Sequence, residues 1–175
     1  MVLSRIAIFS LSTRKGGCSV DLYAMAVHEA GHAVASVLWG RQVEYVTIAP
    51  RGEILSECNN GELLFELEDS QEVNGQRLFR EGVILSAGLA AENLILGIEP
   101  EASRALEDLK RFERLLGRMS EQQKDEMHDS VCRMAFSTIG APMTQRHIIA
   151  VAEELLKVKT LSEAQIKNVM ETASW

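Results

Sequence analysis

The feature that most constrains the fold is a row of apolar residues with helical spacing over residues 20–39. The row contains Leu22, Met25, Ala26, Ala33 and Val37. Side chains that recur every three or four positions share one side of an α-helix, so this segment is predicted to be helical. Gly40 follows directly, and glycine is the common residue just beyond a helix C-terminus. We therefore expect the first helix to end there.

From residue 76 the pattern is helical to the C-terminus. The helix ends are marked by Gly or Pro beside an apolar run, by a Thr that can cap, or by a Ser-x-x-Gln capping box. The predicted helices are 76–96 before Gly97; 102–118 after Pro100; one opened by Ser120 and Gln123 that stops near Gly140; one capped by Thr144 that runs to about Lys159; and one opened by Ser162 and Gln165.

Two short segments predict β-structure. Residues 43–49 alternate in polarity and are rich in β-forming residues, and residues 62–67 follow a turn signal at 59–61. The predicted fold class is therefore mostly α, within the α+β class, with a small β-hairpin or sheet near the N-terminal part. We expect residues 1–19 to form an N-terminal segment of a short strand plus a loop, and residues 20–175 to form one domain.

Charge, cysteines and hydropathy exclude several classes of protein. The net charge is −7, whereas nucleic-acid binding needs clustered Lys and Arg, so no nucleic-acid partner is expected. The three cysteines, Cys18, Cys58 and Cys132, form no CxxC pair, which favours a reducing, cytoplasmic location over a disulfide framework. No stretch approaches the ~20 apolar residues that span a bilayer, so no membrane span is expected.

Residues 28–32 read His-Glu-Ala-Gly-His inside the first predicted helix. Positions four apart lie on one helix face, so the imidazoles of His28 and His32 can bind one Zn²⁺ together. Glu29 would lie beside the metal and act as general base on water that the metal activates. The alternative is a pair of surface histidines with a solvated glutamate. Gly31 argues against it, because a mid-helix glycine costs ~1 kcal/mol and suggests that another backbone or a substrate comes close.

A catalytic zinc needs a third protein ligand. His128 lies in a polar helix and His147 lies near a helix start, so both are expected to be surface or capping residues. The remaining candidates are carboxylates: Glu92, whose charge stands in an apolar run, and Asp108. The residues by themselves do not decide between these two.

Four segments resemble the peptidase domain of FtsH-type membrane AAA proteases. They occur in the family's order: VHEAGHAV at 27–34, VTIAPRGEIL at 46–55, GLAAENLILG at 88–97 and EDL at 107–109. The resemblance covers roughly residues 20–118 and extends more loosely to about residue 170. It implies that residues 20–175 are a helical zinc metallopeptidase domain with one zinc ion per chain.

The resemblance also implies roles for single residues. The family's Asp-Leu pair falls on residues 108–109, which makes Asp108 the third zinc ligand. Glu92 falls on an acidic position that would orient a ligand histidine. An edge strand of the family is thought to bind extended substrate by β-augmentation, which captures a peptide backbone of any sequence. This strand falls on Val46, Thr47, Ile48 and Ala49.

The sequence also departs from that family. It contains no GxxxxGK[ST] nucleotide-binding loop and no transmembrane anchor, and Leu55-Ser56 stands where the family has Leu-Gly. We therefore expect an ATP-independent zinc endopeptidase that hydrolyses unfolded or short peptides. The alternatives are a catalytically silent zinc-binding module that binds peptides or docks on a partner, and a metal-free helical scaffold. A homo-oligomer and a separate ATPase partner are both compatible with the resemblance.

Overall fold

The computed structural model describes residues 19–50, 52, 55–61, 71–97, 102–117 and 119–174. The strand predicted at 62–67 lies outside these residues, as does the predicted N-terminal segment apart from Ser19. The described elements are α1 (Ser19–Leu38), β1 (Tyr45–Thr47), β2 (Glu57–Asn59), α2 (Gln71–Ala91), the π-helical turn η1 (Glu92–Leu96), α3 (Ala102–Leu116), α4 (Glu121–Gly140), α5 (Pro142–Val158), β3 (Thr160–Ser162) and α6 (Glu163–Thr172). The predicted class, mostly α with a small sheet, is confirmed.

The helix ends follow the sequence signals with two exceptions. Capping boxes at Ser120 and Ser162 open α4 and α6, as predicted. Helix α2 begins five residues before its predicted start, because its first turns are polar and show no apolar period. Thr144 is not a cap. Helix α5 begins at Pro142, whose missing N–H suits a first turn, and Thr144 is buried inside the helix.

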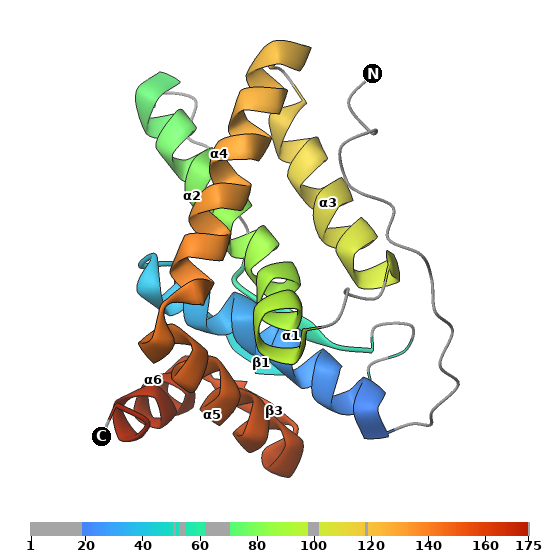
Figure 1. Cartoon of the computed structure of the whole chain (residues 1–175), viewed down its shortest axis with the longest axis vertical. Coiled ribbons are helices and arrows are strands. Elements are labelled where there is room, and N and C mark those ends of the chain that lie inside the picture. Colours follow the sequence, from blue (N-terminus) through green and yellow to red (C-terminus); the bar gives the residue numbers. More distant parts are fainter. Residues whose placement is uncertain are drawn as a thin grey trace.

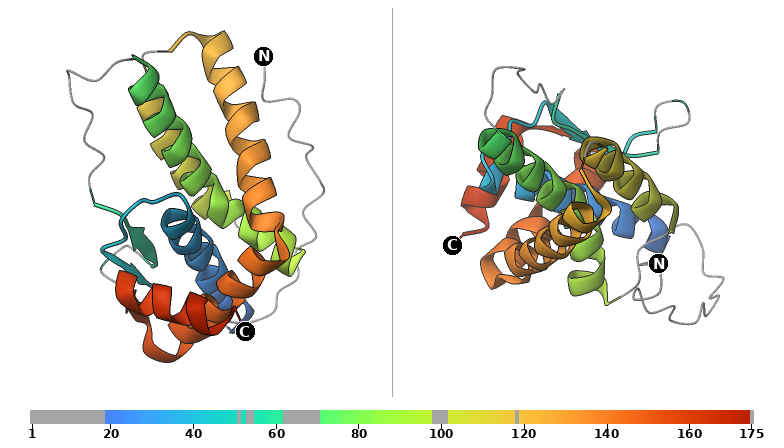
Figure 2. Two further views of the ribbon diagram at one scale, coloured as in Figure 1. Left: turned by 90° about the vertical axis from the view of Figure 1, so that its left-hand side faces the viewer. Right: turned by 90° about the horizontal axis from the view of Figure 1, so that it is seen from above.

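Helix α1 lies at the centre of the molecule, between two groups of elements. Helices α2, α3 and α4 stand beside one another, and α1 crosses beneath one end of this group (Figure 1). On its other side α1 packs against α5, with α6 and the sheet close by (Figures 1 and 2). The side chains of α1 that meet these neighbours are fully buried: Ala26, Val27, Ala30, Ala33 and Val34. A helix covered on both sides must be apolar over most of its surface, which explains this composition.

Gly31 lies where α1 comes close to α2. A Cβ atom at this position would lie 2.8 Å from the carbonyl oxygen of Ala87 and 2.8 Å from the Cβ of Ala91, both in α2. Any side chain would therefore push α2 away from α1. This confirms the prediction that another backbone comes close to this mid-helix glycine.

The three strands form an antiparallel sheet in the order β2-β1-β3. Val46 of β1 pairs with Cys58 on one side and with Leu161 on the other. Beyond the strand, Ile48 donates its backbone N–H to the carbonyl of Lys159 (2.9 Å). The expected edge position is therefore wrong for Val46 and Thr47, because β3 arrives from far along the chain and covers that edge. Ala49 lies beyond the paired residues. An extended substrate cannot pair with a strand that is already paired on both sides.

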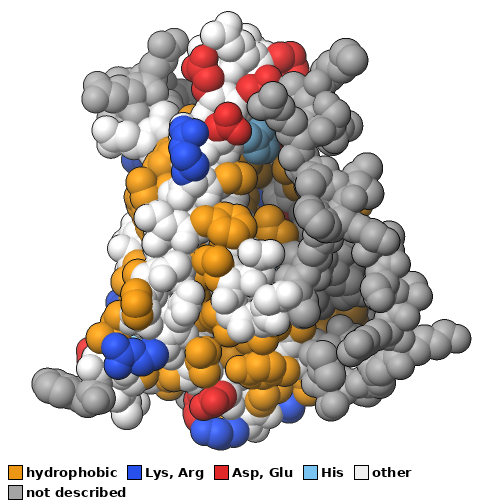
Figure 3. All heavy atoms as spheres, viewed as in Figure 1, with side chains coloured by type: hydrophobic (Ala, Val, Ile, Leu, Met, Phe, Trp, Pro, Cys, Tyr) orange, Lys and Arg blue, Asp and Glu red, His pale blue; other side chains and the backbone are white. Residues whose placement is uncertain are grey.

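The surface of the described residues is mixed in character. Hydrophobic side chains spread over the middle of one face, and charged side chains gather at its two ends (Figure 3). Exposed large apolar side chains in the described part of the chain include Leu94, Met134 and Met143. None of the described helices is both long enough and apolar enough to cross a membrane.

Candidate metal centre

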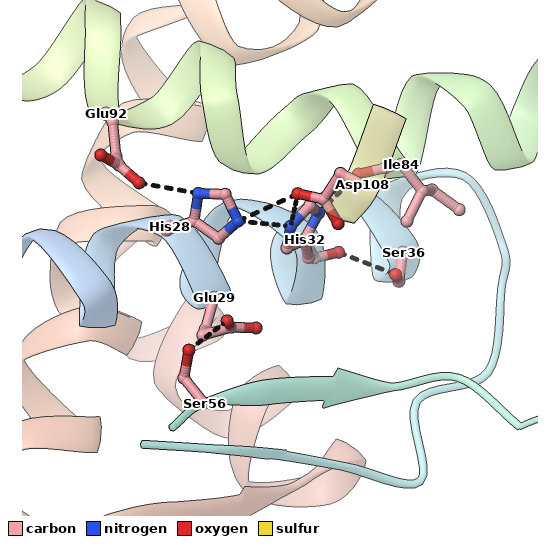
Figure 4. Close-up of polar contacts among 8 residues, drawn as sticks. All are labelled: His28, Glu29, His32, Ser36, Ser56, Ile84, Glu92 and Asp108. Atoms are coloured by element: carbon pink, nitrogen blue, oxygen red, sulfur yellow. Dashed lines mark hydrogen bonds and ion pairs between the residues drawn. The ribbon is translucent and has the colours of Figure 1, made fainter. Parts of the chain in front are cut away.

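His28 and His32 present their imidazoles on one face of α1, four residues apart (Figure 4). Their side chains are almost fully buried, and their Nε2 atoms lie 3.0 Å from each other. A spacing of four residues turns through one helical repeat, which places the two rings over consecutive turns of the same face. The local geometry follows directly from the sequence motif.

Asp108 of α3 completes a group of three side chains. Its Oδ2 atom lies 3.1 Å from Nε2 of His28 and 3.3 Å from Nε2 of His32. Helix α3 is held in place by Phe112, which is buried and one turn beyond Asp108 on the same face. Among the described residues, these three form the group whose ligand atoms come close enough to hold a metal ion.

The other nitrogen of each imidazole is fixed by a different partner. Nδ1 of His32 donates to the backbone carbonyl of Ile84 at 2.7 Å. Nδ1 of His28 faces Oε1 of Glu92 at 2.7 Å, and Glu92 is completely buried at the start of η1. Carbonyl and carboxylate oxygens only accept, so both Nδ1 atoms carry hydrogen. With a metal ion bound, each imidazole would be neutral and would direct the lone pair of its Nε2 atom at the shared point.

This arrangement of acceptors fits a small cation. Two nitrogen lone pairs and a carboxylate oxygen repel one another at 3.0–3.3 Å unless a positive charge lies between them. For tetrahedral zinc with bonds of ~2.0–2.1 Å, neighbouring ligand atoms are about 3.3 Å apart. The separations in this site therefore match a tetrahedral shell, and two imidazoles with one carboxylate form a donor set that zinc favours.

The electrostatics of the group also favour positive charge at this point. Burial lowers the pKa of His28, but the hydrogen bond with Asp108, the contact with Glu92 and the charge of Glu29 outweigh it and raise this pKa to about 9. Burial likewise opposes ionisation of Asp108, yet the charge of His32 and the hydrogen bonds from both histidines hold the pKa of its carboxyl well below the usual range.

Gly88 of α2 gives the two imidazoles their space. A Cβ atom at Gly88 would lie 2.5 Å from Nε2 of His32 and 2.7 Å from Nε2 of His28. These distances are far inside van der Waals contact, so no other residue fits without moving the rings. Glycine at this position is thus required for the observed placement of the two imidazoles, although the sequence pattern alone does not reveal it.

Glu29 lies beside the three-residue group and takes no part in it. Its side chain is 5% exposed, and its Oε1 atom accepts a hydrogen bond from the Ser56 hydroxyl at 2.6 Å (Figure 4). Ser56 is not among the site residues that the sequence predicts. The signal available for it is the replacement of the Leu-Gly pattern by Leu55-Ser56.

The two remaining histidines lie elsewhere. His128 is on α4 and its Nε2 atom pairs with Glu113 of α3 at 2.8 Å. His147 is on α5 and its Nε2 atom lies 3.0 Å from the Ser174 hydroxyl. His147 is buried, so the expectation of a surface or capping residue is wrong for it. Neither histidine belongs to the group formed by His28, His32 and Asp108.

Comparison with known proteins gives two matches. Residues 21–140 match the family described as "Peptidase family M41". A segment of 101 residues is 32% identical to a protein of Mycoplasmopsis pulmonis (strain UAB CTIP) named "ATP-dependent zinc metalloprotease FtsH". That segment is 57% of this chain and 13% of the relative. The chain thus corresponds to a small part of that protein's length.

Proposed function

The chain belongs to peptidase family M41, and on that premise we propose that it is a zinc-dependent endopeptidase that hydrolyses unfolded or short peptides. The observation that carries the proposal is the meeting of His28, His32 and Asp108 at one point, with the carboxylate of Glu29 beside it. Peptide hydrolysis needs an activated water, a polarised substrate carbonyl and a base. A zinc ion held by the three residues would activate the water and polarise the carbonyl, and Glu29 would be the base.

The roles divide between the metal and the residues of the chain. Bound zinc supplies a Lewis acid and lowers the pKa of water towards 7. Glu29 accepts the proton of the attacking water and delivers it to the leaving amine nitrogen as the C–N bond breaks. Glu92 and the carbonyl of Ile84 hold the rings of His28 and His32 in the required orientation.

We place the substrate along β2 instead of β1. In the part of the chain that the structure describes, the outer edge of β2 has no partner strand. The residue before β2 is Ser56, which contacts Glu29, so a peptide that pairs with β2 passes the base. Main-chain pairing does not depend on sequence, which suits an enzyme that acts on unfolded segments.

Metal content and proteolysis, measured on the same preparation, test this proposal. We expect about one zinc ion per chain by elemental analysis, and degradation of a permanently unfolded protein without added ATP. A chelator should stop the degradation and added zinc should restore it. Zinc binding without cleavage would contradict the enzyme and favour a silent binding module. Failure to bind zinc would favour a metal-free scaffold.

We also propose that the chain forms a homo-oligomer or binds a separate ATPase partner. The exposed side chains of Leu94, Met134 and Met143 provide the kind of apolar surface that a partner covers. Sedimentation velocity over a range of concentrations tests the first of these, since a constant monomer mass would remove the homo-oligomer.

A further inference from the structure

Ser56 makes a contact with the candidate general base that no metal ligand makes. Its hydroxyl donates to Oε1 of Glu29 at 2.6 Å (Figure 4). We propose that Ser56 is a positioning residue, which holds the Glu29 carboxylate in place and couples it to strand β2. This inference rests on the proposed function, because it assigns a role within the same site.

The surroundings of Glu29 make this hydrogen bond important. The side chain is 5% exposed, and among the described residues the Ser56 hydroxyl is the group that hydrogen-bonds to its carboxylate. A buried carboxylate that loses such a partner keeps its desolvation penalty and gains rotational freedom. The bond occupies Oε1 and leaves Oε2 available to exchange a proton with water or with the leaving amine.

The position of Ser56 is fixed because β2 is attached to α1 at both ends. Beyond the other end of the strand, Asn60 donates to the Ser36 hydroxyl at 3.0 Å, and Ser36 donates to the backbone carbonyl of His32 at 2.7 Å. Glu29 and Ser36 are two helical turns apart, roughly 10.5 Å along α1. Ser56 and Asn60 span roughly 13 Å of extended chain, so β2 runs beside α1 in the same direction.

The FtsH-type pattern that the sequence resembles has glycine at the position of Ser56. Glycine carries no hydroxyl, so it cannot donate to Glu29. Substitutions of Ser56 can therefore test the effect of the hydroxyl separately from the effect of the backbone. Ser56→Gly and Ser56→Ala remove the donor, whereas Ser56→Thr keeps it and suits an extended strand.

Steady-state kinetics on the zinc-loaded chain test the role of Ser56. With an unfolded peptide substrate, Ser56→Ala and Ser56→Gly should lower kcat by about 10-fold to 100-fold, by analogy with the loss of a partner that orients a metal ligand. KM and zinc affinity should not change, and Ser56→Thr should restore most of kcat. Ser137→Ala, at an exposed position in α4, serves as the control. Unchanged kcat in the Ala and Gly variants, or a loss of zinc affinity together with kcat, would overturn the proposal.

A double-mutant cycle supplies a test that needs no activity. In the metal-free chain, Ser56→Ala should lower the thermal midpoint when Glu29 is present and should have little effect in a Glu29→Ala background. Equal shifts in both backgrounds would overturn the proposal. If the wild-type chain binds zinc and cleaves nothing, the proposed function fails, and the cycle still decides whether Ser56 holds Glu29.

Discussion

In the metal-bound form, the two Nε2 atoms of the candidate metal centre would both present lone pairs, because the hydrogen of each ring would lie on Nδ1. The carbonyl of Ile84 accepts from Nδ1 of His32, the carboxylate of Glu92 lies 2.7 Å from Nδ1 of His28, and Asp108 adds a carboxylate oxygen on the Nε2 side. Two imidazole nitrogens and a carboxylate oxygen within 3.3 Å are unfavourable unless a proton or a metal ion lies between them. At the residue scale the arrangement therefore fits a metal ion, and we expect small changes that move or loosen the rings to lower the metal affinity.

Gly88→Ala should abolish tight zinc binding. The added Cβ would lie 2.5 Å from Nε2 of His32, so the ring must leave its position. The substitution also removes a mid-helix glycine, which by itself would stabilise α2 by up to ~1 kcal/mol. Competition with a chromophoric chelator measures the affinity.

Gly75→Ala, in the same helix, has open space around the new Cβ and is the matched control. It should bind zinc like the wild type. Tight binding by Gly88→Ala would show that the rings do not need this space.

Glu92→Gln should weaken zinc binding by about 10-fold to 100-fold without unfolding the protein, the usual cost of losing a charged partner behind a ligand histidine. The amide keeps an oxygen that can accept from Nδ1 of His28, but it removes the buried negative charge. Glu171→Gln, at an exposed position in α6, controls for the loss of charge alone. Equal affinities for the two variants would contradict the role given to Glu92.

At the scale of elements, the metal centre depends on how α3 is anchored. Phe112 is buried against α2 and α4, and Gly82 makes room for its ring. Phe112→Ala should cost about 3–5 kcal/mol of unfolding free energy, as for other buried aromatic residues, and it should also weaken zinc binding through Asp108.

Leu106→Ala, at an exposed position in the same helix, should change neither quantity much. Urea unfolding and chelator competition measure the two effects. A Phe112→Ala variant with full zinc affinity would mean that Asp108 is held in place by something other than the packing of α3.

The length of each element, and the local signals in it, determine how well the sequence predicts it. Helix α1 and its His-x-x-x-His spacing follow from local periodicity, and capping boxes mark the starts of α4 and α6. Strands β2 and β3 have three residues each, too few to show an alternating pattern. The place of β1 inside the sheet depends on β3, more than 100 residues later, and no local signal carries that information.

The third ligand illustrates the same limit within the site. Glu92 and Asp108 are both carboxylates, and residue chemistry alone does not rank them. The structure separates them by the packing of α2 and α3, which brings Glu92 to Nδ1 of His28 and Asp108 to Nε2. The resemblance assigns them in the same way. The sequence does not predict the roles of Ser56 and Gly88, because their contacts with Glu29 and with the two histidines form only when distant segments of the chain meet.

At the scale of the whole molecule, the metal-free protein should lose stability as the pH rises from 6.5 to about 9. The folded pKa of His28 is about 9, above its ordinary value of 6.5, so the folded state binds a proton that the unfolded state has released. This contribution is complete below pH 6.5 and is lost as the pH rises through about 9.

Zinc should reverse this trend, because protons and metal compete for Nε2 of His28. The increase in thermal midpoint on adding zinc should therefore grow between pH 6.5 and 9. Calorimetry at a series of pH values, with zinc or with a chelator, measures both curves. If the thermal midpoint of the metal-free protein does not fall over this pH range, His28 does not hold a proton beside Asp108 in the folded state.

The central claim is that Glu29 performs proton transfer at a metal held by His28, His32 and Asp108. Zinc content and peptide hydrolysis in the Glu29→Gln variant test it most directly. We expect about one zinc ion per chain, as in the wild type, with hydrolysis reduced by a factor of at least about 100, the lower range for a lost general base. Hydrolysis at the wild-type rate by the zinc-loaded variant would contradict it.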